Sequence, residues 1–340
     1  MGANGTVLCE KARSLHRNSL VVDLHTDSLI AAKLLGRDLS RQHRAPFYFS
    51  PWMLHADLPR LRKGGLGAVF FGVVTHPWPR GAWKRALRII EYSDYLFLKN
   101  QALVRKATSP EEIERVRASG RIAALLGVEG MHVLEGEIER ITALHSLGVR
   151  YITMAHFTTN SFAVSSADPF VRRATLNRMG REAVRLMNEL GMIIDLAHTH
   201  TDIIREVCRL SEKPVIVSHG ATRKLRPVFR NLSDDDIREV ASTGGVIGLI
   251  YATTWLSPGF RRPDLKVVVD HADHIRELAG AGHIALGSDW DGFIMTPKKL
   301  RDAADLPALT ALFLERGYSD EEVRGILGEN FMRVFREVCS

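Results

Sequence analysis

The sequence of 340 residues predicts an α/β fold in which eight parallel strands close into a (β/α)8, or TIM, barrel. Compact apolar segments rich in Val, Ile and Leu alternate with longer segments of helical periodicity, which is typical of parallel βα units. No internal repeat or low-complexity linker divides the chain, so we expect one domain over residues 1–340. The eight predicted strands are residues 19–26, 66–74, 121–128, 149–155, 191–197, 214–218, 244–250 and 283–288.

The segments between these strands carry helix signals. In S-P-E-E at 109–112, Ser109 is a suitable N-cap, the proline fits the first turn and the second glutamate completes a capping box. S-D-D-D at 233–236 predicts another helix start. Residues 81–108 have a long helical pattern, whereas the proline-containing residues 38–64 predict an irregular insertion before the second strand.

Composition and charge argue against several classes of function. The net charge is +7, but the 46 Lys and Arg residues are scattered among 39 Asp and Glu residues, without a basic block interleaved with aromatic residues. This distribution indicates a solvated surface and not a nucleic-acid-binding groove. Cys9, Cys208 and Cys339 lie far apart, which favours neither a disulfide framework nor a thiolate zinc site. We expect a cytoplasmic protein without a membrane span.

The segment V-V-D-L-H-T-D at 21–27 ends the first apolar run with two potential metal ligands. Alternate side chains of a strand share a face, so we expect His25 and Asp27 to point the same way from its C-terminal end. An imidazole and a carboxylate suit zinc or a similar divalent ion, but the pair needs further ligands. An isolated H-x-D pair usually binds no metal. We therefore expect a metal site only if residues of the same kinds follow other strands.

Four later strand ends carry polar residues of the same kinds. They are Glu129 in G-V-E-G, His198 in D-L-A-H, His219 in V-S-H-G and Asp289 in G-S-D-W-D-G. Each has an ordinary explanation when taken alone: a histidine near a strand is usually hydrogen-bonded in the core, and Asp289 or Asp291 is suited to a turn before a glycine. In a TIM barrel, however, all of them meet at the C-terminal rim, where catalytic groups gather.

The number of these residues favours a site for two ions. Three histidines and up to three carboxylates exceed the needs of one tetrahedral zinc, so we expect two divalent ions bridged by one carboxylate. Glu129 is the best candidate for the bridge, because Gly127 and Gly130 on either side of V-E allow the chain to approach closely. The alternative role for Glu129 is that of a helix-capping acid.

Ordered motifs cover nearly the whole chain. They are D-L-H-T-D at 23–27, D-L-P-R-L at 57–61, G-V-E-G at 127–130, G-V-R-Y-I-T-M-A-H at 148–156, G-R-E-A-V at 180–184, D-L-A-H at 195–198, S-H-G-A at 218–221, R-N-L-S-D at 230–234, G-S-D-W-D-G at 287–292 and G-E-N-F-M-R-V-F at 328–335. In these motifs the sequence resembles the renal or membrane dipeptidase family of zinc peptidases, within the amidohydrolase-like barrels.

The resemblance implies a role for each site residue. His25 and Asp27 would bind one zinc and His198 and His219 the other, with Glu129 as the bridge. The resemblance further implies that His156 contacts the transition state and that Arg230 binds a substrate carboxylate. Both roles suit the chemistry, since an imidazole can stabilise a developing oxyanion and a guanidinium matches a carboxylate. A homodimer is also expected.

The chain departs from the usual family pattern around the substrate. F-F-G at 70–72 stands where family members commonly have F-W-S, and A-T-L at 174–176 replaces G-L-T or G-L-S. G-L-I-Y at 248–251 replaces a run that often carries Asn and an aromatic residue. The metal-binding pattern is thus retained, while the preferred substrate side chain is left open.

The expected reaction is hydrolysis of a dipeptide amide bond by a hydroxide held between two zinc ions. Asp289 would accept the proton of the water and pass it to the departing amine. Ser218 lies beside His219, but no G-x-S-x-G elbow surrounds it, so a serine nucleophile is not expected. The alternatives are another amidohydrolase-type reaction, on an N-acyl amino acid or a peptide-like metabolite, and a non-catalytic binding protein on the same fold.

Overall fold

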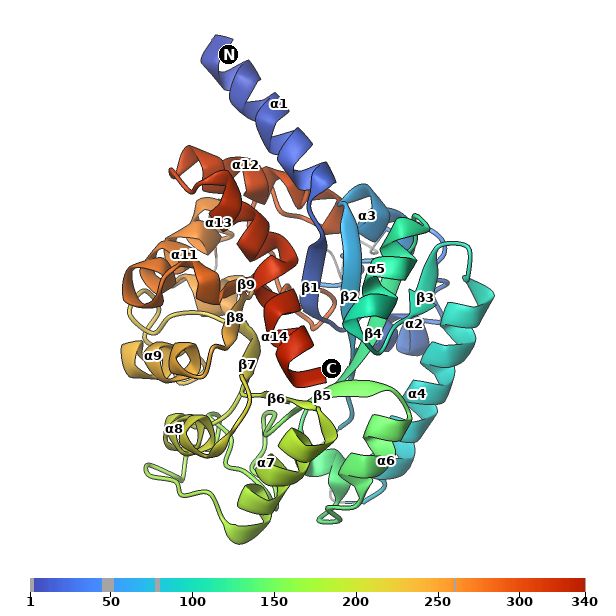
Figure 1. Ribbon diagram of the computed structural model, residues 1–340, viewed down its shortest axis with the longest axis vertical. Helices are drawn as coiled ribbons and strands as arrows, with labels where there is room; N and C mark the ends of the chain where they lie inside the picture. The colour runs from blue at the N-terminus through green and yellow to red at the C-terminus, as the bar shows by residue number, and fades with distance from the viewer. Residues whose placement is uncertain (1–2, 45–51, 77–79, 260, 340) are drawn as a thin grey trace.

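The computed structural model describes residues 3–44, 52–76, 80–259 and 261–339 and contains a closed parallel barrel ringed by helices (Figure 1). Eight strands are hydrogen-bonded in the order β2-β1-β9-β8-β7-β6-β5-β4, and a further pairing of β2 with β4 closes the circle. The barrel strands are β1 (Val21–Thr26), β2 (Leu66–Val73), β4 (Ile122–Val128), β5 (Val149–Thr153), β6 (Ile193–Asp195), β7 (Ile216–Gly220), β8 (Val246–Leu249) and β9 (Ile284–Leu286). The predicted fold class is confirmed, and each predicted strand lies within two residues of its expected bounds.

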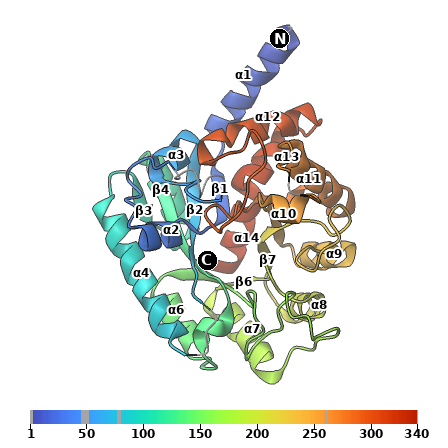
Figure 2. The same ribbon diagram turned by 180° about the vertical axis from the view of Figure 1, so that it is seen from behind.

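Helices cover the outside of the barrel on all sides (Figures 1 and 2). Their apolar faces pack on the outward side chains of the strands, whereas inward side chains fill the barrel. The helices are α1 (Ala3–Asn18), α2 (Ser28–Leu35), α3 (Leu58–Lys63), α4 (Ala82–Lys99), α5 (Pro110–Ala118), α6 (Arg140–Ser146), α7 (Arg178–Leu190), α8 (Thr201–Leu210), α9 (Asp234–Ser242), α10 (Thr253–Leu256), α11 (Lys266–Ala279), α12 (Pro307–Glu315), α13 (Asp320–Arg324) and α14 (Asn330–Cys339). None of the helices in the described part of the chain combines the length and the apolar character that a bilayer span requires.

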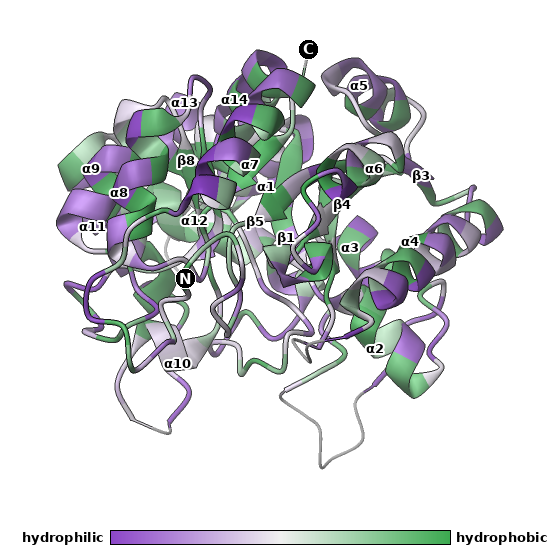
Figure 3. Cartoon of the chain, turned by 90° about the horizontal axis from the view of Figure 1, so that it is seen from below, coloured by the Kyte–Doolittle hydropathy of each residue, from purple (hydrophilic) through white to green (hydrophobic). Residues whose placement is uncertain are grey.

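One end of the barrel is closed by α14. Phe331 and Phe335 of this helix stack at 5.5 Å, and both contact the inward-facing Phe70 edge-on. Burial of such aromatic side chains contributes about 1.5–3 kcal/mol each. Figure 3 shows α14 on the side of the barrel opposite to α2, α10 and the long loops, which follow the C-terminal ends of the strands. Among the described residues, the loops that can build a site therefore gather at this second end.

The region between β2 and β4 differs from the prediction. The helical pattern at 81–108 gives α4, which ends at Lys99, and then a ninth strand, β3 (Val104–Lys106), which pairs with β4 outside the barrel. The side chain of Asn100 stops the helix, because its amide donates to the carbonyl of Leu96 at 2.9 Å. Three residues are too short a run to be recognised as a strand from periodicity.

The helix-start signals are confirmed with one change. Ser233 and Asp236 form the reciprocal capping box at α9. Ser109 caps α5, but Glu112 accepts from the amide of Thr108, one residue before the cap, at 2.7 Å. In the predicted insertion at 38–64, Asp57 caps α3, while residues 45–51 with their two prolines lie outside the described residues.

Candidate metal centre

The residues predicted at the strand ends meet at the C-terminal rim. Glu129 is the common neighbour, because its Oε1 atom lies 3.1 Å from Nε2 of His198, 3.4 Å from Nε2 of His219 and 3.9 Å from Nε2 of His25. Asp27 joins the group with Oδ1 at 3.2 Å from Nε2 of His25. All five side chains are buried. Five potential ligand groups from four strands thus converge on one small volume.

Three overlapping sets of these atoms have the spacing of metal ligands. In each set, one ligand atom per residue lies within 4.8 Å of the others. The sets are His25, Asp27 and Glu129; Glu129, His156 and His198; and His25, His219 and Asp289. Nε2 of His25 and Oδ1 of Asp27 are buried without a hydrogen-bond partner among the described residues, which fits a group that binds a cation.

The orientation of His25 is fixed from behind by Tyr151. The tyrosine hydroxyl lies 2.7 Å from Nδ1 of His25 and donates to the carbonyl of Leu24 at 3.2 Å. Since that hydroxyl proton is already used, Nδ1 of His25 donates to the tyrosine oxygen, which leaves Nε2 as the ring atom that faces the carboxylates and could bind a metal ion. Gly127 provides room, because a Cβ atom there would lie 2.0 Å from the Tyr151 ring. Gly127 was expected to let the chain approach the metal ions, but the space that it leaves is occupied by the ring of Tyr151.

His219 is oriented by a second buried network. Its Nδ1 lies 2.9 Å from the hydroxyl of Ser218, which donates to Asp195 at 2.7 Å. Asp195 is fully buried and also accepts from the hydroxyl of Thr153 at 2.6 Å. By the same reasoning as for His25, Nδ1 of His219 donates to Ser218 and Nε2 is left as the ligand atom. Ser218 thus holds the ring of His219 in place through its hydroxyl oxygen, and its lack of a nucleophilic role stays a prediction.

The charges at the site favour a bound cation. Burial lowers the pKa values of His198 and His219 well below their usual range, so both rings are neutral, and their Nε2 atoms lie 3.0 Å apart. Burial raises the pKa of Glu129 to about 8, although the neighbouring His25 opposes this shift. Burial alone would lower the pKa of His25, but Glu129 and Asp27 outweigh it and raise that pKa to about 10. Clustered carboxylates here need a positive charge, which a divalent ion can supply.

Glycines allow the acidic residues to come close together. A Cβ atom at Gly72 would lie 2.7 Å from Oδ1 of Asp27, and one at Gly292 would lie 2.5 Å from Oδ1 of Asp289. The departure from the family pattern at 70–72 therefore leaves space directly beside Asp27. In this chain a larger residue at position 72 would push on a predicted metal ligand.

Asp289 lies at the centre of a strained loop after β9. Its φ is +61°, and Asp291 and Phe293 also have left-handed backbones at +69° and +57°. Oδ1 of Asp289 lies 4.0 Å from Nε2 of His25, and burial together with the charge of Asp27 raises its pKa well above the usual range. Asp291 instead supports the loop, since its Oδ1 accepts from the amide of His55 at 2.6 Å.

His156 and Arg230 approach the centre from two further loops. Nε2 of His156 lies 3.4 Å from Oε2 of Glu129, and burial lowers the pKa of this histidine to about 4, so its ring is neutral. Arg230 is 4% exposed and donates through Nη2 to the carbonyl of His219 at 2.8 Å. Its Nε has no hydrogen-bond partner among the described residues. Arg230 is not among the residues that line the cavity described below.

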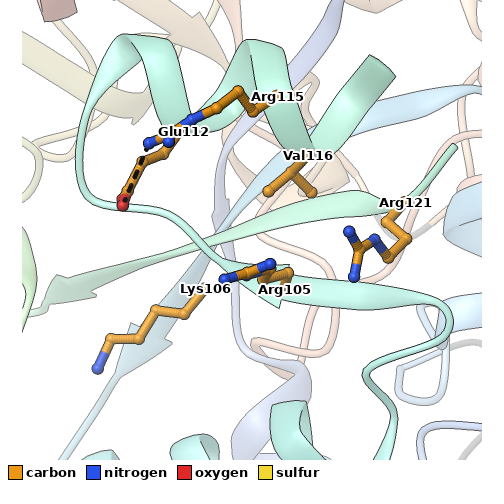
Figure 4. Close-up of a pocket in the computed structure, with 6 residues that line it drawn as sticks. All are labelled: Arg105, Lys106, Glu112, Arg115, Val116 and Arg121. Carbon is orange, nitrogen blue, oxygen red and sulfur yellow. Dashed lines mark ion pairs between the residues drawn. The ribbon is translucent and has the colours of Figure 1, made fainter. Parts of the chain in front are cut away.

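A cavity of about 330 Å³ opens over these groups, and its walls include Asp27, Glu129, His156, His198 and Asp289. A second hollow, of about 160 Å³, lies elsewhere, between β3 and α5 (Figure 4). Four of its six lining residues are basic; among them, Lys106 pairs with Asp94 at 2.7 Å and Arg115 lies 3.8 Å from Glu112, which also lines the hollow. Of these two hollows, the first combines buried acids with neutral histidines.

Sequence reasoning did not identify Tyr151, Ser218 or Asp195 as functional residues. Tyr151 and Asp195 occur in the motifs G-V-R-Y-I-T-M-A-H and D-L-A-H, whose last residues, His156 and His198, are the predicted site residues. For Asp195 and Ser218 the available signal was an ionisable or hydroxyl side chain within an otherwise apolar strand, one to three residues before a predicted ligand. A buried polar group of this kind requires a partner, and here the partner is a histidine or its support.

Comparison with known proteins places this geometry in a family. The solved structure of the probable dipeptidase PvdM from Pseudomonas aeruginosa is similar, with a TM-score of 0.87, 22% identity and coverage of 98% of each chain. A metallo peptidase from Rhodobacter sphaeroides, liganded with a phosphinate mimic of the dipeptide L-Ala-D-Ala, gives a TM-score of 0.84 at 22% identity, with 94% of this chain and 100% of that chain covered.

An amidohydrolase from Pseudomonas aeruginosa gives a TM-score of 0.81 at 24% identity and covers 96% of this chain and 98% of its own. At these identities the three structures establish the shared barrel fold. The sequence itself carries the assignment further, because residues 9–340 match the family of membrane dipeptidases. The chain therefore belongs to the membrane dipeptidase family, peptidase family M19.

Proposed function

We propose that the protein hydrolyses the amide bond of dipeptides with a free C-terminal carboxylate, using two divalent ions, with zinc as the native metal. Membership of the M19 family and the likeness to metallopeptidases support metal-dependent dipeptide hydrolysis. The observation that carries the proposal is the position of Glu129, with one oxygen within 4 Å of three histidine Nε2 atoms and Asp27 close by.

The ligand chemistry fits zinc. His25, Asp27 and Glu129 would hold one ion, and His198, His219 and Glu129 the other, which gives each ion three protein ligands and leaves positions for water and substrate. Neutral imidazole and carboxylate are ligands that zinc accepts readily. Ions bound to this set supply Lewis-acid activation of water and polarisation of the scissile carbonyl.

The remaining residues handle the proton and the substrate. Asp289, with its raised pKa, accepts a proton from the attacking water and delivers it to the departing amine. The neutral His156, from the neighbouring loop, donates a hydrogen bond to the oxyanion that develops on the carbonyl. Arg230 retains a free Nε donor, which suits the C-terminal carboxylate of a dipeptide.

An assay with matched substrates tests this proposal. Purified protein is incubated with L-Ala-L-Ala, its C-terminal amide, N-acetyl-L-alanine and L-Ala-L-Ala-L-Ala, and the metal content is measured in parallel. We expect hydrolysis of the dipeptide, close to two ions per chain, loss of activity with a chelator and recovery with zinc. Cleavage of N-acetyl-alanine in preference to the dipeptide would indicate the N-acyl amino acid reaction. Metal-loaded protein that hydrolyses none of these substrates would contradict the proposal.

Glu129→Gln tests the bridge separately. Glutamine keeps the shape of the side chain but not its charge, so we expect the variant to hold less than two ions per chain and to lose most of its activity. One ion per chain in the fully active parent, together with full activity of Glu129→Gln, would require a mononuclear mechanism.

A further inference from the structure

The cavity above the metal centre has two chemically different halves. Buried acids and histidines form its floor, as described above, whereas the wall formed by the loops after β8 and β9 is mostly apolar. That wall consists of Ala252, Thr254, Trp255, Phe293 and Ile294. Among these residues, Thr254 is the polar one, and none carries a charge. A charged substrate side chain placed here would lose its hydration without gaining a partner.

Two aromatic side chains of the cavity are unusually open to solvent. Phe157 is 49% exposed and Phe293 is 56% exposed, although both line the cavity beside buried groups. Phe293 also has a left-handed backbone with φ +57°, a conformation that is uncommon for a bulky residue and is typically retained at functional sites. Large exposed aromatic rings next to reactive groups are typical of ligand pockets.

The apolar wall is attached to the loop that carries Arg230. Phe229, the residue before Arg230, contacts the ring of Trp255 edge-on with 5.7 Å between centroids. Asn231, the residue after Arg230, donates from its side chain to the carbonyl of Trp255 at 2.8 Å. These two contacts, one from each neighbour of Arg230 in the chain, therefore fix Trp255 relative to this arginine. Phe157 lies elsewhere, against the rings of His156 and His198 at 4.5 and 4.9 Å.

We propose that the enzyme prefers dipeptides whose C-terminal residue has a large apolar side chain, aromatic above all, which packs against Trp255, Phe293 and Ile294. This inference rests on the proposed function, since it takes Arg230 as the group that binds the C-terminal carboxylate. Because Phe229 and Asn231 attach Trp255 to the loop of Arg230, the substrate residue that pairs with Arg230 would lie nearest to Trp255. The side chain of that residue, and not that of the N-terminal residue, then meets the apolar wall.

Isomeric dipeptides provide the test. L-Ala-L-Phe and L-Phe-L-Ala have the same composition and differ only in which residue carries the aromatic ring, and L-Ala-L-Ala gives the baseline. Burial of a phenylalanine side chain corresponds to an increase of roughly 10-fold to 100-fold in kcat/KM for L-Ala-L-Phe over L-Ala-L-Ala. We expect L-Phe-L-Ala to lack most of this gain.

Variants of the wall test the same point from the protein side. Trp255→Ala should reduce kcat/KM for L-Ala-L-Phe at least about tenfold more than for L-Ala-L-Ala, mainly through KM. Phe293→Asn should act in the same direction, and asparagine tolerates the left-handed backbone at this position. Tyr95→Ala, which removes an exposed aromatic ring on α4, is the matched control and should leave all three rates unchanged.

The outcomes separate the two levels of the argument. Equal kcat/KM values for the three dipeptides, or a preference for L-Phe-L-Ala, would overturn the inference and leave dipeptide hydrolysis intact. Retention of the L-Ala-L-Phe preference in both folded wall variants would also overturn it. Hydrolysis of none of the three dipeptides by the metal-loaded protein would overturn the proposed function and this inference with it.

Discussion

The hydroxyl of Tyr151 lies 2.7 Å from Nδ1 of His25, although the two residues are 126 positions apart in the chain. Tyr151 is fully buried inside the barrel, where its ring contacts Phe70 at 4.9 Å between centroids. Because Tyr151 contacts both Phe70 and His25, the packing inside the barrel helps to fix the position of a predicted metal ligand. It also explains why position 127 is a glycine, because a larger residue there would displace the ring.

The first prediction concerns this hydroxyl. Tyr151→Phe removes the partner of Nδ1 of His25 and leaves the aromatic packing in place, so His25 is held less firmly in the ligand orientation. Loss of such an outer hydrogen bond typically lowers metal affinity about 10-fold to 100-fold. The affinity is measured by competition with a chromophoric chelator, independently of activity.

Tyr251→Phe is the control for Tyr151→Phe. Tyr251 is also fully buried, but its hydroxyl has no hydrogen-bond partner among the described residues. Its removal should leave metal affinity unchanged and should not reduce thermal stability. Equal affinities for the parent and Tyr151→Phe would show that the tyrosine has only a packing role.

The second prediction concerns pH and uses a histidine far from the metal centre. His16 is 2% exposed; its Nε2 donates to the carbonyl of Gly64 at 2.8 Å, and its Nδ1 lies 2.7 Å from the hydroxyl of Thr310. Burial lowers the pKa of His16 below its ordinary value of 6.5. At a pH between the lowered pKa of His16 in the folded chain and its ordinary pKa of 6.5, the unfolded chain binds a proton that the folded chain does not. Stability therefore falls as the pH drops below about 6.5, by up to about 1.4 kcal/mol per pH unit for this group.

His16→Gln should reduce this pH dependence, since a glutamine amide is neutral and can both donate and accept. The free energy of unfolding in urea, measured with chelator at pH 7.5 and pH 5.5, should fall less in the variant than in the parent. Other buried histidines add to the parent's slope, so the comparison between the two proteins is the decisive quantity. His76→Gln, at an exposed position, is the matched control. If the free energy of unfolding fell equally in the parent and in His16→Gln, this part of the pH dependence could not be assigned to His16.

The third prediction tests Arg230 as the carboxylate-binding residue. The parent should hydrolyse L-Ala-L-Ala much faster than its C-terminal amide, and Arg230→Met should remove that difference. A charge-assisted contact of a buried arginine is worth about 2–5 kcal/mol when one partner is removed, which is a factor of roughly 30 or more. Comparing both substrates in both proteins separates the carboxylate contact from general damage to the site. An unchanged ratio in a folded Arg230→Met variant would assign the carboxylate to another group.

The sequence predicts the barrel and the ligand-bearing strand ends because both depend on local patterns. His25 and Asp27, for example, follow an apolar run, and the fold class then requires that all such ends meet at one rim. Burial, donor partners and tautomers depend on contacts across the barrel, so the role of Tyr151 could not be predicted. The same holds for Trp255 and Phe293, which reach one cavity from separate loops.

The fourth prediction separates Asp289 as a proton carrier from Asp289 as a metal ligand. Both roles suit its place, because it lies within ligand spacing of His25 and His219 and is also part of the cavity wall. The carrier role is favoured by ligand number, since His25, Asp27, Glu129, His198 and His219 already give each of two ions three protein contacts. Asparagine keeps the shape and one coordinating oxygen but carries no proton. Asp289→Asn should therefore lower kcat by roughly 10²-fold to 10⁴-fold.

Metal content decides between the two roles. If Asp289 carries the proton, Asp289→Asn should retain the metal content of the parent, and excess zinc should not restore kcat. Asparagine also suits the left-handed backbone at this position, so the loop after β9 should keep its conformation. Loss of one ion in Asp289→Asn, with activity recovered by added zinc, would instead make Asp289 a ligand. In that case His156, whose Nε2 lies 3.4 Å from Glu129, becomes the next candidate for the proton carrier.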